Sequence, residues 1–506
     1  MYKQIYFILA LILACLNLGF CQMYWEKLYD NLSYKFSDKP APRRDAAIGF
    51  DIERQRVIIY GGWQVNPSHS NTNSFTMPVL FDDTWEFNLK TKTWKPLSFS
   101  LNRPSARYGM LYSHSKHGLY ISCGKGLFEN YLNDLWVYDF SDDQWRKMDQ
   151  TYISINPEAR YSPIGGIYPS YEFNTNDLKN NLYLGMGRAQ YEMFDNMFYY
   201  QFTDLRSLNG MWDRIYTEIL TGPYSFTHPH GRAYSSSTMI SPDELLIHSG
   251  CLSGSFSGGP CPSADSWIFS HKYNKWEKVD SSCISPRLYS SMASVISDGY
   301  RKSAVLFSGL EIDRTILKTE IELEDEVALY DNLANRWVIK KVQGFFFPEK
   351  RNGHVMCTGK FNSDFGVFMF GGFGHSSDNT LGDLWFLKVN ISTIFENEIS
   401  PNFYTINTNK KNKCSTYFST IHLHAILMFI GCAILINISN IISNYFKSKK
   451  YSKIFYFTFM LLGLLIVSVG LIFGFWSSRG LPHLAHSIIG IFTYLLLLIQ
   501  PIVQLM

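Results

Sequence analysis

The chain has 506 residues, enough for more than one hydrophobic core, and 46% of them are hydrophobic. Its formal net charge is only +3 and its charged residues are scattered, which argues against nucleic acid as a partner. The apolar residues gather in one block at the beginning and three blocks near the end, a distribution typical of membrane proteins. We therefore expect an integral, multi-pass membrane protein with a folded domain between these blocks.

Residues 1–21 have the features of a secretory signal peptide. Lys3 precedes an uncharged run over Ile5–Phe20, and small residues stand before the cleavage position. A retained signal anchor is the alternative, because the apolar run is slightly long. Either interpretation places the following domain in the lumen or outside the cell, where the sequons at Asn31 and Asn390 are expected to be glycosylated.

The stretch Arg107–Met148 predicts a unit of four antiparallel strands. Arg107–Ser113 supplies the first, and Leu119–Ser122 is an apolar second strand that ends at a glycine. Leu135–Tyr138 and the segment around Trp145 supply the third and fourth strands. Such a sheet cannot bury both of its faces alone, so it needs neighbouring copies of itself.

Copies of this unit recur along the chain. Each copy begins with an arginine, continues with an apolar run that ends in glycine, and finishes with two aromatic strands. The arginines are Arg44, Arg107, Arg160, Arg232, Arg287 and Arg351. Glycines followed by a spaced pair of aromatic residues resemble the kelch repeat, whose repeats of about 50 residues form propeller blades. The resemblance implies an all-β, six-bladed kelch-type propeller over residues 22–392.

The sixth copy lacks its final tryptophan strand. It has its glycines and Trp385, but no second tryptophan follows. The segment Tyr24–Leu28, with Trp25 in it, matches the tryptophan strand of the other copies. We therefore expect this N-terminal strand to complete the sixth blade, which closes the ring and leaves no open sheet edge.

The cysteines indicate disulfides, because an oxidising compartment favours them. Cys251 and Cys261 bracket a loop rich in glycine and serine and are the favoured pair, although Cys283 competes for either partner. The sequence has no CxxC spacing of the kind that binds metal.

The propeller has no hydrolase-type motif in its sequence. The acidic run Glu320–Glu326 is best explained as a solvated part of the fifth-blade insertion, and the pair His228 and His230 is by itself a weak metal signal. Propellers serve as enzymes and as binding modules, so the fold alone does not decide between them. We expect a partner-binding or scaffolding unit whose ligand is a protein or a glycan.

A linker over 393–415, rich in Asn, Thr and Lys, precedes the apolar C-terminal part. Three charge-free stretches there each exceed the ~20 residues needed to cross a bilayer. They predict an α-helical transmembrane bundle of three helices over residues 416–506, with helices near 418–446, 454–476 and 481–504. Lysines in the first loop favour a cytosolic position, while lysines before the first helix oppose it. The signal peptide decides for a cytosolic loop.

Histidines inside membrane helices are costly and usually functional. His424 and His486 lie near the outer ends of the first and third predicted helices, beside small residues that leave room for a flat macrocycle. The segments His424–Lys447 and His486–Pro501 resemble the two helices of the cytochrome b561 family that share one haem. The resemblance implies His424 and His486 as axial ligands of the iron in haem b. His483 shares a helix face with His486 and is a candidate for a group at the haem edge or one that supports a ligand.

The chain also departs from the pattern of that family. Tyr456 stands where a histidine for the second, cytosolic haem is expected, and the last helix of the family is absent. The resemblance therefore implies one haem, electron transfer restricted to the outer side and the need for a redox partner, as in a b561-type oxidoreductase. The alternative is a non-redox adhesion, receptor or scaffold protein whose helices serve only as an anchor.

Overall fold

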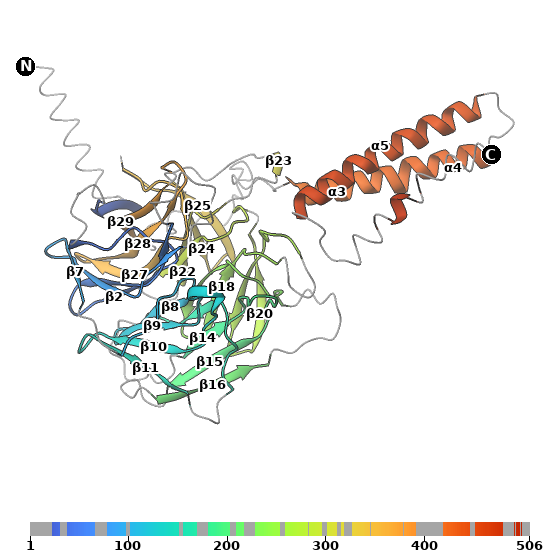
Figure 1. Cartoon of the computed structure of the whole chain (residues 1–506). Helices are drawn as coiled ribbons and strands as arrows, with labels where there is room; N and C mark the ends of the chain where they lie inside the picture. Colours follow the sequence, from blue (N-terminus) through green and yellow to red (C-terminus); the bar gives the residue numbers. More distant parts are fainter. Residues whose placement is uncertain are drawn as a thin grey trace, which may run out of the picture. The chain divides into compact units, whose positions relative to one another are not determined.

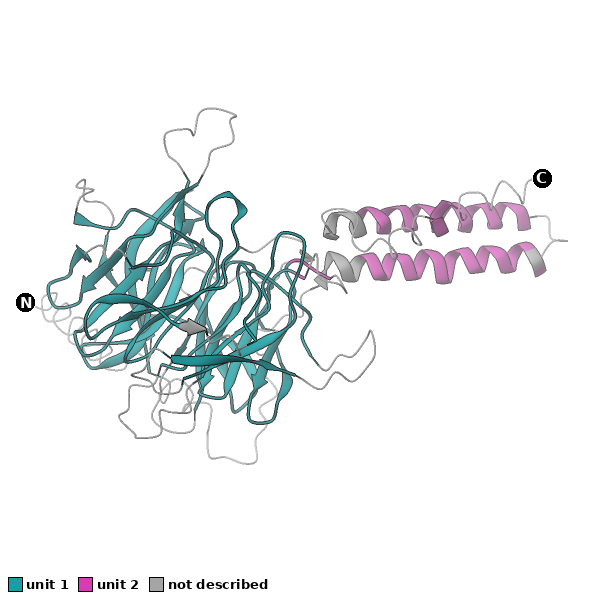
Figure 2. Ribbon diagram, turned by 60° about the horizontal axis from the view of Figure 1, so that its bottom comes forward, with its two compact units in different colours: residues 1–251, 262–311, 322–414 teal, residues 252–261, 312–321, 415–506 magenta. Residues whose placement is uncertain are grey.

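The fold is described by a computed structural model in which contacts divide the chain into two compact units (Figure 2). The first comprises residues 1–251, 262–311 and 322–414, and the second comprises 252–261, 312–321 and 415–506. The predicted signal peptide and linker lie outside the described residues and stay predictions. The structure describes residues 23–30, 38–65, 78–97, 102–150, 155–169, 181–202, 209–216, 228–252, 259–281, 283–295, 301–310, 315–317, 326–344, 346–377, 379–390, 418–445, 451–478, 490, 492–495 and 497.

The first unit contains six sheets, antiparallel except for the short β12 of blade 3, which are the blades of a propeller (Figure 1). From the inner to the outer strand, blade 1 contains β2 (Ala47–Asp51), β3 (Arg56–Tyr60), β6 (Thr84–Asn88) and β7 (Thr93–Pro96). Blade 2 contains β8 (Leu111–His114), β9 (Gly118–Ser122), β10 (Leu135–Asp139) and β11 (Gln144–Lys147). Blade 3 contains β13 (Ile164–Gly166), β14 (Leu182–Gly185), β15 (Met197–Phe202), β16 (Asn209–Ile215) and the short β12 (Asp149–Gln150).

The remaining three blades repeat this order. Blade 4 contains β17 (Ser236–Ser241), β18 (Glu244–His248), β19 (Ser266–Ser270) and β20 (Lys275–Val279). Blade 5 contains β21 (Ser291–Val295), β22 (Ser303–Phe307), β24 (Glu326–Asp331) and β25 (Arg336–Lys341). Blade 6 contains β27 (Val355–Phe361) with β26 (Arg351–Asn352), then β28 (Asp364–Gly374), β29 (Thr380–Val389) and β1 (Met23–Tyr29). The smaller elements are β4 (Trp63–Gln64), β5 (Val79–Leu80) and the short helix η3 (Leu127–Glu129).

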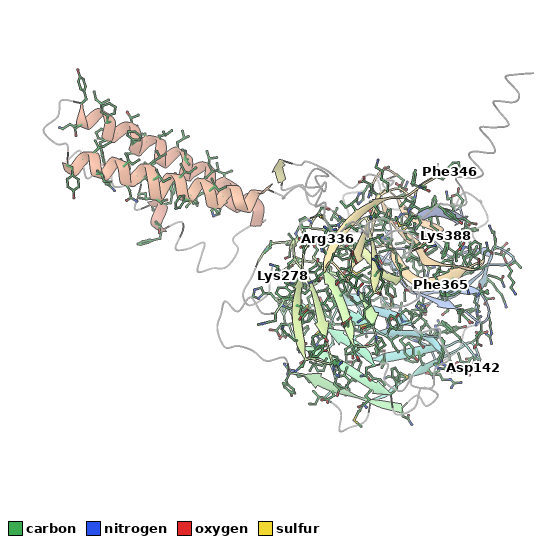
Figure 3. All side chains as sticks on the ribbon, turned by 180° about the vertical axis from the view of Figure 1, so that it is seen from behind. Asp142, Lys278, Arg336, Phe346, Phe365 and Lys388 are labelled. Carbon is green, nitrogen blue, oxygen red and sulfur yellow. The ribbon has the colours of Figure 1, made fainter. Side chains whose placement is uncertain are left out.

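The ring is closed by the N-terminal strand, as the sequence predicts. β1 pairs antiparallel with β29, so that Trp25 lies opposite Leu387 and Met23 opposite Val389. Lys388 (Figure 3) reinforces this edge with an ion pair to Asp364 at 2.8 Å and with its ammonium 5.5 Å from the ring centre of Tyr24. The six inner strands also contact one another in turn, and β27 returns to β2. The predicted six-bladed propeller is therefore confirmed.

The hydrophobic core of the propeller is divided among the interfaces between neighbouring blades. One cluster between blades 5 and 6 brings Trp25, Phe307 and Trp385 together, and the other interfaces hold equivalent clusters. Strands such as β3, β9 and β22 are buried at every residue because a blade covers each face of their sheet. This explains why their sequences are continuous apolar runs rather than alternating ones.

The repeated arginine needs one correction. The fully buried arginines are Arg43, Arg107, Arg160, Arg232, Arg287 and Arg351, so Arg43 and not Arg44 belongs to the repeat. Five of these arginines also precede the inner strands instead of opening them, since β8, for example, begins at Leu111 and not at Arg107, whereas Arg351 opens the short β26. Arg44 is only partly buried and belongs to a different ring of residues.

The second unit contains two long helical segments. The first runs through α3 (Thr420–Met428), the π-helical η5 (Phe429–Ile436) and α4 (Asn437–Tyr445), and the second is α5 (Ser452–Ser478). β23 (Thr315–Leu317) and β30 (Phe418–Ser419) form a small pair in the same unit. Residues 424–443 and 452–472 are apolar and long enough to cross a membrane. Of the third predicted helix, only residues 490, 492–495 and 497 are described, all helical, so the three-helix bundle stays a prediction.

Candidate functional site

Each buried arginine joins the strands of its own blade. Arg107 donates two hydrogen bonds to the Asp134 carboxylate, at 2.5 and 2.9 Å, and one to the Cys123 carbonyl at 3.2 Å. The indole of Trp136 donates to the same carboxylate at 2.7 Å. The same Arg–Asp–Trp arrangement recurs at Arg43, Asp83 and Trp85, at Arg232, Asp265 and Trp267, and at Arg351, Asp383 and Trp385.

These carboxylates are stabilised in their charged form. Burial raises the pKa of the Asp134 carboxyl, but the hydrogen bonds and the charge of Arg107 outweigh it, so that this pKa lies below its ordinary value. The arginines are buried and their acids are already paired. We conclude that they hold the blades together and do not bind a ligand.

A second ring of residues follows the buried arginines by two positions. Its members have a left-handed backbone and are Asp45, Gly109, Ser162, Tyr234, Tyr289 and Gly353. Hydrogen bonds connect each member to the next, for example from the Gly109 amide to the Asp45 carbonyl at 3.1 Å, and from the Asp45 amide to the Gly353 carbonyl at 2.7 Å. This ring fixes the connections that enter the inner strands.

All six residues of this ring line a cavity of about 140 Å³ at the centre of the propeller. Residues from the inner strands of every blade line the rest of it, including the polar side chains of Ser113, Ser294 and Thr358. A cavity of this volume has room for water molecules or a small polar group.

Six side chains form a closed series of contacts next to the left-handed ring, and we call them the collar; two of them, Tyr234 and Tyr289, also line the cavity. They are Arg44, Trp63, Tyr108, Tyr161, Tyr234 and Tyr289. Neighbouring ring centres along the series from Trp63 to Tyr289 are 5.7, 5.4, 5.7 and 4.6 Å apart. The Arg44 guanidinium closes the circle, at 5.2 Å from the ring centre of Tyr289 and 5.1 Å from that of Trp63.

Arg44 fills the place that blade 6 leaves open in the collar. Blade 6 has Gly353 there, and a Cβ at this glycine would lie 2.7 Å from the Arg44 Nε and 2.9 Å from an Asp45 oxygen. The Asp45 carboxylate accepts hydrogen bonds from the Arg44 Nε at 3.0 Å and from the Trp63 indole at 2.8 Å. Burial lowers the pKa of the Arg44 guanidinium, but the charge and hydrogen bond of Asp45 together with the neighbouring Tyr161 and Tyr289 outweigh this effect, so that the pKa is raised and Arg44 stays charged.

The collar is surrounded by loops with exposed aromatic side chains. Isolated backbone bridges join Tyr108 to Lys125 and Tyr161 to Arg188, which places the loops of blades 2 and 3 beside the collar. Phe128 on the first loop is 84% exposed and Tyr191 on the second is 91% exposed. We call this side of the propeller the collar face. Aromatic residues and arginine are the residue types that dominate binding energy at protein interfaces.

The sequence carries only a weak signal for the collar, a tyrosine one or two positions after four of the buried arginines. Tyr108 and Tyr161 directly follow a buried arginine, whereas Tyr234 and Tyr289 come two positions after one. The pair His228 and His230, by contrast, lies with ring centres 6.4 Å apart. No group of three or more possible metal-ligating side chains occurs among the residues that the structure describes.

Of the histidines predicted to bind haem, the structure describes only His424. Its Nδ1 lies 2.8 Å from the Gly470 carbonyl oxygen in α5. Gly431, one of the small residues expected to leave room for a macrocycle, faces α5 closely, since a Cβ there would lie 2.5 Å from Val467. His483 and His486 lie outside the described residues, so the predicted ligand pair and its haem stay predictions.

The structure describes some of the residues that are predicted to form disulfides or to be glycosylated. Cys251, Cys261 and Cys283 are each disulfide-bonded, while the pairing of Cys251 with Cys261 stays a prediction. Asn390 follows β29 and is exposed, as a glycosylated residue must be, and Asn31 lies outside the described residues.

A comparison with protein families agrees with the propeller fold. Residues 57–373 match the profile of a family described as the Attractin/LZTR1 beta-propeller. Over 191 residues, 37% of its length, the chain is 25% identical to the dynein alpha chain of the flagellar outer arm from Chlamydomonas reinhardtii, of which it spans only 4%. A solved structure titled "Structure of YjhT" is 13% identical, with a TM-score of 0.44, and the match covers 69% of this chain and 95% of that one.

Proposed function

Because the chain belongs to the Attractin/LZTR1 beta-propeller family, we propose that it is a membrane-anchored propeller that binds a partner protein. Propellers of very different sequence bind ligands on the loops and channel mouth at one end. The exposed aromatic side chains of the collar face carry the proposal. A membrane anchor would keep the propeller at a membrane surface, where other surface proteins are available as partners.

The outward faces of the second unit support the membrane anchor. Phe429 is 64% exposed, Leu461 60% and Ile472 63%, in helices whose apolar side chains project outward (Figure 3). Such faces are stable when lipid covers them. The disulfide-bonded cysteines of the propeller support an oxidising, lumenal or extracellular side. Protection of the propeller from added protease in sealed vesicles, and its loss on permeabilisation, checks that orientation.

Variants on the two ends of the propeller test partner binding. Phe128→Asn and Tyr191→Asn each remove an exposed aromatic side chain from the collar face. The control is Tyr273→Asn, because Tyr273 is 71% exposed in the turn between β19 and β20, at the end of those strands away from the collar. Asparagine suits Phe128 because that residue has a positive φ of 55°.

The measurement is proximity labelling by the full-length protein in cells that express it. Proteins labelled by the wild type and by Tyr273→Asn, but not by the two collar-face variants, are the expected partners. Equal labelling by all variants would contradict the proposal. Labelling that disappears after enzymatic removal of glycans from the cell surface would assign the ligand as a glycan instead.

A second candidate function, electron transfer through one outer-side haem b, rests on the orientation of His424. Imidazoles that bind metals commonly use their other ring nitrogen for a hydrogen bond to a carbonyl or carboxylate, and Nδ1 of His424 has such a contact with Gly470. The close packing of Gly431 against Val467 opposes a macrocycle at that position. A haem held by His424 and His486, with His483 at its edge, would supply one-electron iron chemistry to a redox partner.

A reduced-minus-oxidised absorption spectrum of the purified full-length protein tests this second candidate. A b-type α band that disappears in His424→Ala and in His486→Ala, but persists in Tyr456→Phe, is the expected result. If the wild type shows no such band after expression with added haem, the helices serve as an anchor without a cofactor. The partner-binding proposal does not depend on the outcome.

A further inference from the structure

The collar presents hydrogen-bond donors that have no acceptor. Arg44 uses its Nε for Asp45, and its two terminal NH₂ groups form no hydrogen bond with any residue that the structure describes. The side chain is 15% exposed and is held between the rings of Trp63 and Tyr289. The guanidinium is therefore fixed in position while its outer edge is open to a ligand.

A second guanidinium lies on the other side of the stacked tyrosines. Arg188 donates to the Tyr234 hydroxyl at 3.4 Å, and the rings of Tyr234 and Tyr289 are 4.6 Å apart. Burial raises the pKa of Tyr108 to about 12, so its hydroxyl keeps its proton at neutral pH and can donate. The collar and Arg188 thus present both guanidinium and tyrosine donors.

Most acids near the collar already have partners. Asp45 accepts from Arg44 and Trp63, and Glu129 is paired with Lys125 and accepts from Tyr131 at 3.2 Å. Glu192 is exposed on the same loop as Arg188 and has no ion pair with the described residues. The hydrogen-bonding groups of the collar that can still take a partner are therefore mainly donors. They match a ligand that has several hydrogen-bond acceptors.

We propose that the collar binds the carboxylate of an acidic segment in the partner protein, with Arg44 as its main contact. A planar carboxylate accepts two parallel N–H···O bonds from a guanidinium, a geometry that an ammonium group cannot reproduce. The exposed side chains of Phe128 and Tyr191 beside the collar favour a polypeptide that lies across the face over a small free anion. This inference rests on the proposed function, because it names the chemistry of the same partner.

The test uses fluorescence anisotropy with the full-length protein in detergent. The probe is a fluorescein-labelled peptide with glutamates in a Gly/Ser background, and the control peptide carries glutamines in their place. We expect the glutamate peptide alone to bind, and its affinity to fall as salt is added. Arg44→Lys keeps the charge but loses the paired donors and should weaken binding by about tenfold. Arg214→Lys, at an exposed position on β16, should leave it unchanged.

Glu192→Gln is the second variant, because this exposed side chain can be changed without affecting the fold. Removing its negative charge should tighten binding of the glutamate peptide. Equal binding of the two peptides, or unchanged affinity in both Arg44→Lys and Glu192→Gln, would overturn the inference. Preferential binding of a uronic-acid oligosaccharide would overturn the assignment to a protein segment. If the collar-face variants lose their partner while neither peptide binds, the proposed function stands and the carboxylate inference falls.

Discussion

Trp25→Ala should destabilise the propeller strongly, because Trp25 joins the two ends of the propeller sequence. Its side chain is only 6% exposed, and its ring centre lies 5.3 Å from that of Phe307 and 6.4 Å from that of Trp385. Truncating a buried tryptophan to alanine costs about 3–5 kcal/mol. The Trp25 indole N–H has no hydrogen-bond partner among the residues that the structure describes, so this loss is one of packing.

The assay is thermal unfolding of the full-length protein in detergent, followed by intrinsic fluorescence. Each kcal/mol shifts the midpoint by roughly 2–4 °C in domains of about 150–250 residues and by less in larger ones, so we expect a decrease on the order of 5–10 °C. Trp25→Phe should retain most of the stability. Glu26→Ala, at a partly exposed position on the same strand, should change the unfolding free energy by no more than about 0.5 kcal/mol. Equal midpoints for Trp25→Ala and Glu26→Ala would show that the sixth blade closes without this strand.

Three further predictions concern acid stability and covalent structure. The midpoint should fall as the pH drops below about 4, because Asp134 and Asp265 have lower pKa values when folded than when unfolded. The stability they contribute is present above the unfolded pKa and is lost progressively as the pH falls from there through the folded pKa, so a pH series should show a smaller acid effect in Asp134→Asn. Peptide mapping without reduction should recover Cys251 linked to Cys261, and a link from either to Cys283 would replace that pairing. Asn390→Gln should abolish part of the mobility shift that a glycosidase causes, whereas an unchanged shift would exclude glycosylation there.

The strands and the closure of the ring could be predicted because each depends on a local signal. The apolar run Leu119–Ser122, which is followed by a glycine, corresponds to β9 in the structure. The aromatic pattern around Trp25 identified the strand that completes the sixth blade. The choice between Arg43 and Arg44 could not be made from sequence, since the two are adjacent and equally basic. The structure identifies Arg43 as the member of the repeat because its side chain is buried. Arg43 also stands two positions before the left-handed residue Asp45, and each buried arginine of the other blades likewise stands two positions before a left-handed residue.

The collar could not be predicted for a different reason. Its tyrosines occur at two different positions relative to the buried arginines, and its sixth place is filled by Arg44 from blade 1 above a glycine of blade 6. An alignment of the repeats compares equivalent positions of the blades. It therefore does not reveal side chains that come together in space from different positions of the repeat. The contact of His424 with Gly470 was equally invisible, because it depends on the packing of two helices.

The central claim, that the collar face contacts a partner protein, is tested most directly by site-specific photocrosslinking. A photoreactive amino acid replaces Phe128 in one full-length variant and Tyr273 in another, and both are illuminated in the native membrane. We predict a discrete crosslinked species from position 128 that is absent from position 273 and is lost when Arg44→Gln is added. Crosslinks of equal yield and identity from both positions, or from position 273 alone, would contradict the account.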